Sequence, residues 1–176
     1  MKPVTPYALA GRGPQSREQV VTFSIADQSF AVSAAAVQEI RAADNLGGVV
    51  REIEQPVLSK VRHIVERDGN AYYVVSGQEH FHLRRSRPAS VLILRGLRAA
   101  VLVDRIEEMA EMRVLFTLPA SFLGLERGWY RGLTVLNGRV LPVVDPRGFL
   151  TGEECEVLEQ STAEVLQTMQ AGEKSR

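Results

Sequence analysis

The chain repeats itself at a constant offset of 69 residues. At this offset Glu39 falls on Glu108, and Gly69 falls on Gly138. An unbroken register over two separate stretches indicates one β-rich unit that is built twice. The repeat therefore predicts two similar lobes with a groove between them. The matched blocks are residues 22–40 with 91–109 and residues 69–76 with 138–145.

Composition excludes several classes of protein. The 176 residues include 21 basic and 21 acidic ones, so no overall field draws the chain toward nucleic acid or anionic lipid. The single cysteine, Cys155, rules out an internal disulfide and fits a reducing compartment. No apolar run reaches the roughly 18 residues of a membrane-spanning helix. We therefore expect a cytoplasmic protein without membrane insertion.

Alternating apolar residues and turn dipeptides predict a series of hairpins. Asp68-Gly69 and Asn137-Gly138 are the strongest turn signals, because these residues tolerate the positive φ that tight hairpin turns require. Residues 34–40 fit one helical turn that leads into a strand, although the period alone does not decide this, and residues 44–48 form a loop. The predicted hairpins cover residues 20–32, 61–75, 90–103 and 131–144.

The ends of the chain differ from this β-rich middle. Residues 1–18 contain three prolines and little apolar periodicity, which predicts a flexible arm. Apolar residues recur at helical spacing after Gly152, which predicts an amphipathic helix over about residues 153–171 within a C-terminal segment, 153–176. The predicted fold class is mainly β: two pseudo-repeated five-stranded antiparallel barrels over residues 19–152, followed by the helix.

The chain carries little that points to catalysis. It has no glycine-rich phosphate loop, nucleophile elbow or zinc-binding spacing. His80 and His82 would share one face of a strand, but no third metal ligand is evident. Asp104 and Asp145 each end an apolar strand, where an aspartate usually caps a turn rather than acts as an acid or base. We expect no enzyme, no metal and no cofactor.

A nucleic-acid-binding barrel is the alternative function. Tyr72, Tyr73 and Phe81 lie near Arg84 and Arg85 in the sequence, and exposed aromatics beside arginines can stack on single-stranded bases. The zero net charge weighs against this class. The basic loop of residues 84–87 could contact phosphate, although such a cluster is more often a solvated loop.

Four short motifs occur in a definite order along the chain. Each repeat has an opening hairpin that ends in an apolar–x–Glu–apolar element, Val37–Ile40 in the first and Ile106–Met109 in the second. With these motifs the sequence resembles the CheW-like adaptor domain of bacterial chemosensory systems over about residues 18–152. The four stretches are residues 21–40, residues 90–109, Leu118-Pro119 leading to Tyr130-Arg131-Gly132, and residues 139–145.

The resemblance implies two intertwined five-stranded barrels without enzymatic activity. Such domains link the cytoplasmic tips of chemoreceptors to the regulatory domain of a CheA-type histidine kinase, and other CheW-like domains are further candidate partners.

Carried over to this chain, the resemblance assigns partner contacts to Val37, Glu39 and Ile40. It assigns Val101, Val103 and Ile106 to the groove for the receptor's helical hairpin. Glu108 repeats the position of Glu39. Apolar strand residues are also often core residues, and a glutamate between them can be plainly solvated, so both interpretations stay open here.

The first-lobe turn departs from the family pattern. Family members carry Asn-x-Arg-Gly where this chain has Glu66-Arg67-Asp68-Gly69, so Asp68 reverses the charge of an arginine that helps partner binding in the family. Arg67 is adjacent to Asp68, but neighbouring strand residues point to opposite faces. We therefore do not expect Arg67 to take over the role of the family's turn arginine. His63 and Tyr73 stand where the family has glycine and proline. We therefore predict a divergent adaptor with one contact changed or lost, in which Arg67, Asp68 and Gly69 belong to the partner surface.

Overall fold

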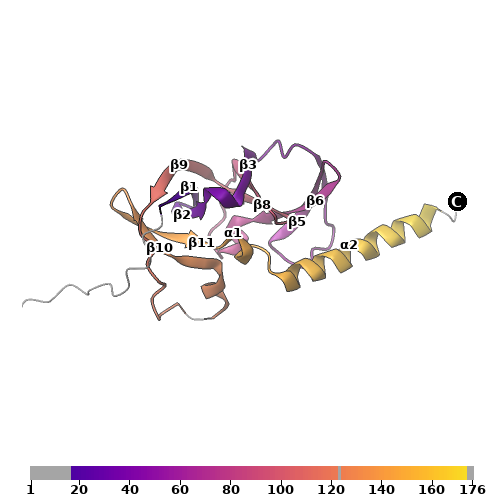
Figure 1. The fold of residues 1–176 in the computed structure, drawn as a ribbon. Coiled ribbons are helices and arrows are strands. Elements are labelled where there is room, and N and C mark those ends of the chain that lie inside the picture. Colours follow the sequence, from indigo (N-terminus) through magenta and orange to yellow (C-terminus); the bar gives the residue numbers. More distant parts are fainter. Residues whose placement is uncertain (1–16, 123, 174–176) are drawn as a thin grey trace, which may run out of the picture.

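The computed structural model describes residues 17–122 and 124–173, and it describes side chains as far as Ala163. Two β-sheets form the body, and a long helix follows them (Figure 1). The first strand begins at Glu18. Most of the predicted N-terminal arm, residues 1–16, lies outside the described residues.

The first sheet has five strands in the order β10-β11-β2-β1-β9. All neighbouring strands are antiparallel except β11 and β2, where Val143 lies opposite Ala31 in parallel. The isolated bridge between Phe116 and Leu133 brings the chain after β9 back to β10. The strands are β1 (Glu18–Ile25), β2 (Gln28–Ser33), β9 (Arg105–Met112), β10 (Tyr130–Leu136) and β11 (Arg139–Val144).

The second sheet has six strands in the order β3-β7-β8-β6-β5-β4. Its one parallel pair is β6 with β8, where Val74 lies opposite Ala100. Its strands are β3 (Val37–Ala42), β4 (Val49–Glu52), β5 (Val61–Arg67), β6 (Asn70–Ser76), β7 (Ser90–Leu94) and β8 (Ala99–Val103). The helical segments are the 3₁₀ helices η1 (Ala34–Ala36), η2 (Leu125–Trp129) and η3 (Pro146–Gly148), and the α-helices α1 (Gly77–His80) and α2 (Gly152–Glu173).

The 69-residue offset relates the two sheets strand by strand. Adding 69 to the bounds of β5 gives those of β10, and the parallel pair Val74–Ala100 corresponds to Val143–Ala31 at the same offset. Each sheet combines the opening hairpin of one repeat with later strands of the other: β1 and β2 pair with β9 and β11, while β7 and β8 pair with β3 and β6. The lobes are therefore intertwined, and neither contains the strands of one repeat alone.

The mainly β fold of two pseudo-repeated units with a terminal helix is confirmed, but the barrels differ from the prediction. The described strands form two open, SH3-like sheets rather than closed barrels, and each sheet contains one parallel pair. The parallel pairs arise because each sheet joins strands from both repeats. The second sheet also has a sixth strand, β4. In the first sheet the corresponding pairing is reduced to the single bridge between Phe116 and Leu133.

The four predicted hairpins are present, and residues 34–40 contain a 3₁₀ turn that leads into β3. The turns at Asp68-Gly69 and Asn137-Gly138 adopt the expected positive φ. The turn of the first hairpin lies at Ala26 and Asp27. Neither residue is glycine, although both have positive φ, so composition does not mark this turn.

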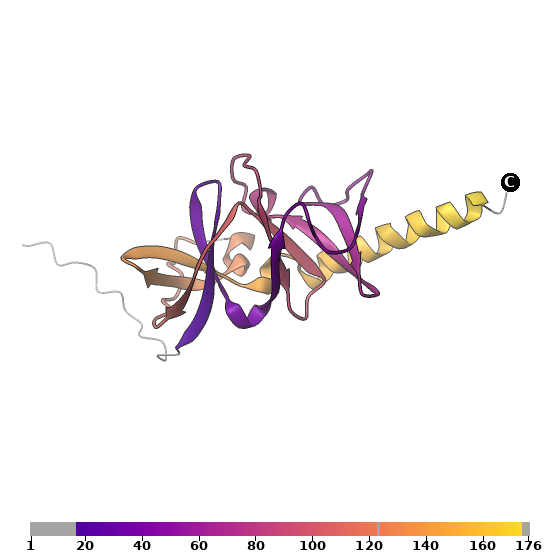
Figure 2. The same ribbon diagram turned by 90° about the horizontal axis from the view of Figure 1, so that it is seen from above.

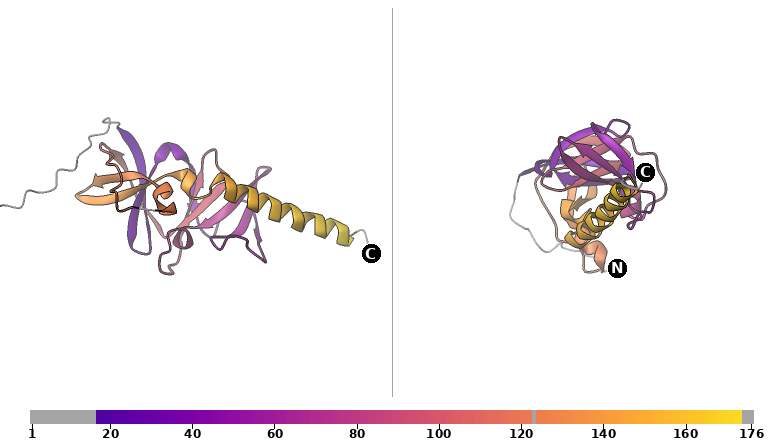
Figure 3. Two further views of the ribbon diagram at one scale, coloured as in Figure 1. Left: turned by 90° about the horizontal axis from the view of Figure 1, so that it is seen from below. Right: turned by 90° about the vertical axis from the view of Figure 1, so that its right-hand side faces the viewer.

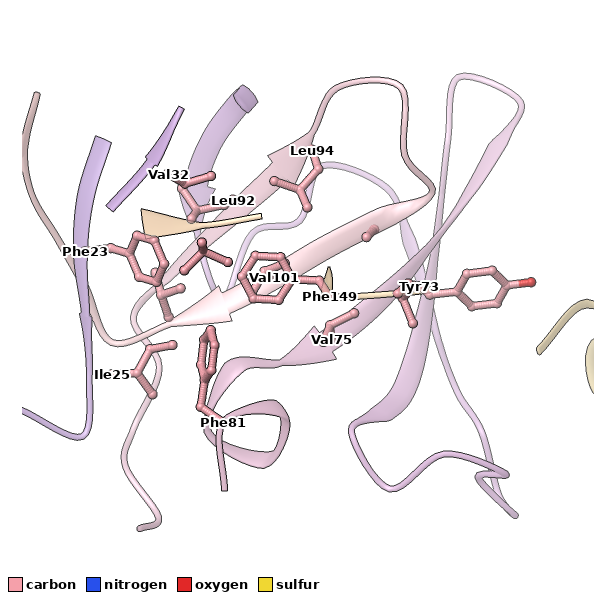
Figure 4. Packing of buried hydrophobic residues seen from close by; sticks show 14 of the residues in the cluster. Phe23, Ile25, Val32, Tyr73, Val75, Phe81, Leu92, Leu94, Val101 and Phe149 are labelled. Atoms are coloured by element: carbon pink, nitrogen blue, oxygen red, sulfur yellow. The ribbon is translucent and has the colours of Figure 1, made fainter. Parts of the chain in front are cut away.

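The largest hydrophobic cluster lies between the two sheets rather than inside either lobe (Figure 4). It joins Phe23 and Val32 of the first sheet to Val75, Leu92 and Val101 of the second. Two smaller clusters fill the individual lobes, one around Val20 and Val143 and the other around Val74, Ile93 and Leu46. Strands β7 and β8 are consequently buried on both faces, as their continuous apolar sequence predicts.

Helix α2 packs its first turns on the body and then projects away from it (Figures 2 and 3). Leu158 is buried in the inter-sheet cluster, and Cys155 packs against the same cluster. Two ion pairs hold this part of the helix: Lys60 Nζ to Glu154 Oε1 at 2.7 Å and Arg98 to Glu159 at 2.5 Å. No helix in residues 17–122 or 124–173 is both long enough and apolar enough to cross a membrane.

Candidate functional site

An ion-pair cluster centred on Glu39 joins two strands of the second sheet that are far apart in its strand order. One oxygen of the Glu39 carboxylate accepts a hydrogen bond from Arg41 Nε at 2.5 Å, and the other accepts from an Arg67 guanidinium nitrogen at 2.7 Å. Glu39 and Arg41 lie on β3, while Arg67 ends β5. The sheet therefore curls until its edge strand β3 reaches the β5–β6 turn.

The two arginines set the charge state of Glu39. The Arg67 hydrogen bond, followed by the Arg41 hydrogen bond, holds the pKa of the Glu39 carboxyl below its ordinary value, and both bonds outweigh the opposing effect of burial. The carboxylate therefore stays ionised at neutral pH. Its side chain remains 32% exposed, so the ion pair is accessible from solvent.

Arg67 is packed far more tightly than a residue beside a hairpin turn usually is. Its side chain is 11% exposed, and a Cβ on Gly48 would lie 2.5 Å from its Cγ atom. Its Nε atom has no hydrogen-bond partner among the described residues. The absence of a side chain at Gly48 thus allows the arginine to lie beneath the loop and reach Glu39. Arg67 provides a guanidinium beside Glu39, while the neighbouring Asp68 and Gly69 are exposed at the turn.

The two apolar residues of the first predicted element face different surroundings. Val37 packs partly against the inter-sheet cluster. Ile40 is 41% exposed on β3, which is the edge strand of the second sheet, and it faces away from Glu39 because strand side chains alternate. Ile40 therefore belongs to a surface that a partner could cover, whereas Val37 belongs to the packing between the sheets.

The residues assigned to the groove lie in or against the core. Val101 is fully buried in the inter-sheet cluster (Figure 4). Val103 is fully buried in the same cluster, and Ile106 is half-buried against it. Among the sequence-predicted residues the structure thus brings Glu39, Arg67 and the Asp68-Gly69 turn together. It keeps Val101 and Val103 away from the surface.

Glu108 repeats the arrangement of Glu39 with a different partner. Its carboxylate accepts a hydrogen bond from Asn137 Nδ2 at 2.7 Å, which joins β9 to the β10–β11 turn of the first sheet. In both repeats the glutamate of the edge strand therefore binds the second hairpin at its turn. In the second sheet this bond is an ion pair, whereas in the first sheet its donor is the neutral amide of Asn137.

The histidine pair does not lie on a strand, contrary to the prediction. His80 ends the short helix α1, and His82 follows in a turn with positive φ. His80 packs against Trp129 and Phe149 with ring centroids 4.6 and 5.1 Å away. Burial, and to a smaller extent Lys60, lowers the pKa of His80 to about 3, so the ring is neutral. In the described part of the chain no group of three or more His, Cys, Asp or Glu residues is placed to hold a metal.

The other candidate sites take structural roles. Asp104 accepts hydrogen bonds from the backbone of Ala26 and from Ser86, both at 2.7 Å, and Asp145 caps η3 through the backbone nitrogen of Arg147. Asp145 therefore caps the turn that follows its own strand, as predicted, whereas Asp104 links the β1–β2 turn to the loop before β7. Tyr73 and Phe81 are buried in the inter-sheet cluster, so they cannot form the exposed stacking face that the nucleic-acid alternative requires.

Sequence reasoning missed two parts of this surface. Arg41 was not predicted as a partner of Glu39, although two residues on one strand with a spacing of two share a face. Strand β4 also went unpredicted, and its exposed Val49 and Val50 lie on the outer edge of the second sheet. Its four residues are too few to show alternation, so only the pairing with β5 reveals it.

Comparisons with known proteins show the family and the fold of the chain. The model of the CheW-like domain matches residues 19–154. A solved structure, the scaffolding protein TtCheW from Thermoanaerobacter tengcongensis, is similar with a TM-score of 0.65 at 14% sequence identity, over 79% of this chain and 96% of that one. No curated protein matches significantly in sequence. The chain therefore belongs to the CheW-like domain family.

Proposed function

We propose that the protein is a non-enzymatic adaptor of a bacterial chemosensory array. In this role it joins the cytoplasmic tip of a chemoreceptor to the regulatory domain of a CheA-type histidine kinase, at arrays on the cytoplasmic side of the membrane. The observation that carries the proposal is the CheW-like match over residues 19–154, which spans both lobes and every strand of both sheets.

The surface around β3 supports this role. Ile40 exposes apolar area on an edge strand, where a partner can add both apolar contact and main-chain hydrogen bonds. The charged cluster of Glu39, Arg41 and Arg67 is prearranged on the opposite face of β3. Such fixed charges select a partner and its register more than they add affinity. Val101 and Val103 then act by packing the two sheets together rather than by touching the partner.

The test of Ile40 is binding of the full chain, by pull-down and isothermal titration, to the kinase regulatory domain and to a receptor hairpin fragment separately. Replacing Ile40 with Glu should weaken binding to at least one of them about tenfold or more, because it places a charge in an apolar contact. Val157→Glu is the matched control, since Val157 is 44% exposed but lies on α2. Wild-type protein that binds neither partner would rule out the adaptor role.

The Asp68 turn gives a second, independent test. Asp68 is exposed, so Asp68→Arg restores the charge typical of the family without disturbing the core. If the reversed charge has changed one contact, this variant should bind one of the two partners roughly tenfold more tightly. Equal affinities of wild type and variant for both partners would show that Asp68 lies outside the contact.

A further inference from the structure

A pocket of about 350 Å³ opens on the second sheet where β5, β6 and α1 meet. Part of its wall is apolar, formed by Val74 of β6 and Leu102 of β8. Polar and charged side chains from β5 and the residue before it, from the end of β6, from α1 and from the loop before β7 complete the lining. Concave sites with an apolar wall and a few converging polar groups are the usual form of small-molecule sites. None of the sequence-predicted partner residues lines this pocket.

The charges around the pocket are unbalanced. Lys60, Arg62 and Arg85 line it together with His63, against one carboxylate in the lining, Glu79. Lys60 is already paired with Glu154 of α2. Arg62 and Arg85 form no ion pair within the described parts of the chain. Both residues are exposed, so an anion in the pocket can pair with their guanidinium groups without breaking an existing ion pair.

The segment that carries Arg85 is held in place on both sides. After it, Gln78 Oε1 accepts hydrogen bonds from the backbone nitrogen of Ser86 at 2.6 Å and from the Ser86 hydroxyl at 3.2 Å. Before it, Arg84 forms an ion pair with Asp27 of the first hairpin turn. The hydrogen bonds of Ser86 restrict the chain directly after Arg85, which lowers the entropic cost of binding.

We propose that this pocket binds a small organic anion, with its carboxylate or phosphate group held by Arg62 and Arg85 and its apolar part against Val74 and Leu102. The guanidinium group suits both headgroups because its planar donors match two acceptor oxygens at once. This proposal is independent of the adaptor role, since the pocket shares no residue with the β3 surface.

The experiment titrates the full chain with phenyl phosphate, benzoate and benzyl alcohol, followed by amide chemical shifts and calorimetry. We expect one or both anions to bind, more weakly as salt rises, while the neutral alcohol does not. Stronger binding of phenyl phosphate would identify phosphate as the preferred headgroup, and stronger binding of benzoate would identify carboxylate. Failure of both anions at millimolar concentration, or equal binding of the alcohol, would overturn the proposal.

Single variants then locate the site. Arg85→Ala and Arg62→Ala should each weaken binding about tenfold or more, because each removes a charged hydrogen bond to the ligand. Glu79→Gln should strengthen binding, since it removes the opposing charge in the lining. Arg87→Ala is the matched control, with the same change of charge in the same loop but outside the lining. If Arg87→Ala lost as much affinity for the anion as Arg85→Ala, the loss would reflect the overall charge of the loop, and the proposed site would be overturned.

Discussion

Glu39 and Glu108 occupy equivalent positions of the two repeats, and each binds the hairpin that follows it. Glu39 meets two arginines, whereas Glu108 meets the amide of Asn137. The glutamate at this position thus connects the edge strand of a lobe to its second hairpin. In the second sheet the connection is ionic and depends on pH.

The two glutamates give a matched pair of variants at the residue scale. The pKa of Glu39 is lowered in the folded state, so its ion pairs stabilise the fold above the unfolded value of about 4.3 and lose that effect as pH falls through the lowered folded value. Glu39→Gln should therefore lower the unfolding free energy at pH 7 by a few tenths of a kcal/mol, because the pair is partly exposed.

This difference between wild type and Glu39→Gln, measured by urea denaturation, should become smaller as the pH is lowered from 7 to 3. Glu108→Gln is the control, since Glu108 bonds to a neutral amide. A difference for Glu39→Gln that is as large at pH 3 as at pH 7 would contradict the ionic role of Glu39.

At the scale of elements, the position of the short helix α1 depends on how closely the backbone of Gly77 approaches strands of both sheets. A Cβ on Gly77 would lie 2.5 Å from Ile25 Cδ1 of β1 and 2.6 Å from the Leu102 carbonyl oxygen of β8. Gly77 is therefore the point at which α1 fits between strands of the two sheets. Gly138, by contrast, has open space around it and is required only by the positive φ of its turn.

The two glycines should respond differently to alanine. Gly77→Ala should destabilise the fold by about 1–3 kcal/mol, because the added methyl group has to displace a buried side chain and a strand carbonyl. Gly138→Ala should cost only about 1 kcal/mol, the strain of a left-handed backbone conformation. Chemical denaturation of both variants measures the difference, and a larger loss for Gly138→Ala would show that α1 is not tightly fitted.

At the scale of the whole molecule, the two lobes share one core. Phe30 of β2 stacks on Phe23 and on Phe81, which follows α1, with ring centroids 5.6 and 4.6 Å away. Each sheet also takes strands from both repeats. The lobes should therefore unfold together, as one cooperative unit.

Phe30→Ala tests this cooperativity. Removing the buried ring should cost about 3–5 kcal/mol, and it should raise hydrogen exchange equally in the β1–β2 and β7–β8 hairpins. Val140→Ala, at an exposed position of β11, is the control and should change stability by about 0.5 kcal/mol or less. Faster exchange confined to the β1–β2 hairpin would show that the lobes unfold independently.

The sequence alone determined the features that depend on local chemistry. Asp-Gly and Asn-Gly turns, apolar alternation and a constant 69-residue offset located the hairpins and showed that one unit occurs twice. These signals are local because turn conformation and strand pattern depend on neighbouring residues. The same holds for the turn-capping role of Asp145, which accepts from a backbone nitrogen two residues away.

Only the tertiary structure decided how the repeats combine and which residues meet. The exchange of strands, the parallel pairs and the strand β4 depend on pairing between distant segments, which no local pattern encodes. Burial of Val101 and exposure of Ile40 likewise depend on where the sheets touch, since both are apolar strand residues in the sequence. The hydrogen bond between Glu39 and Arg67 forms because the second sheet curls until β3 reaches the end of β5 beside the β5–β6 turn. This curvature appears only in three dimensions.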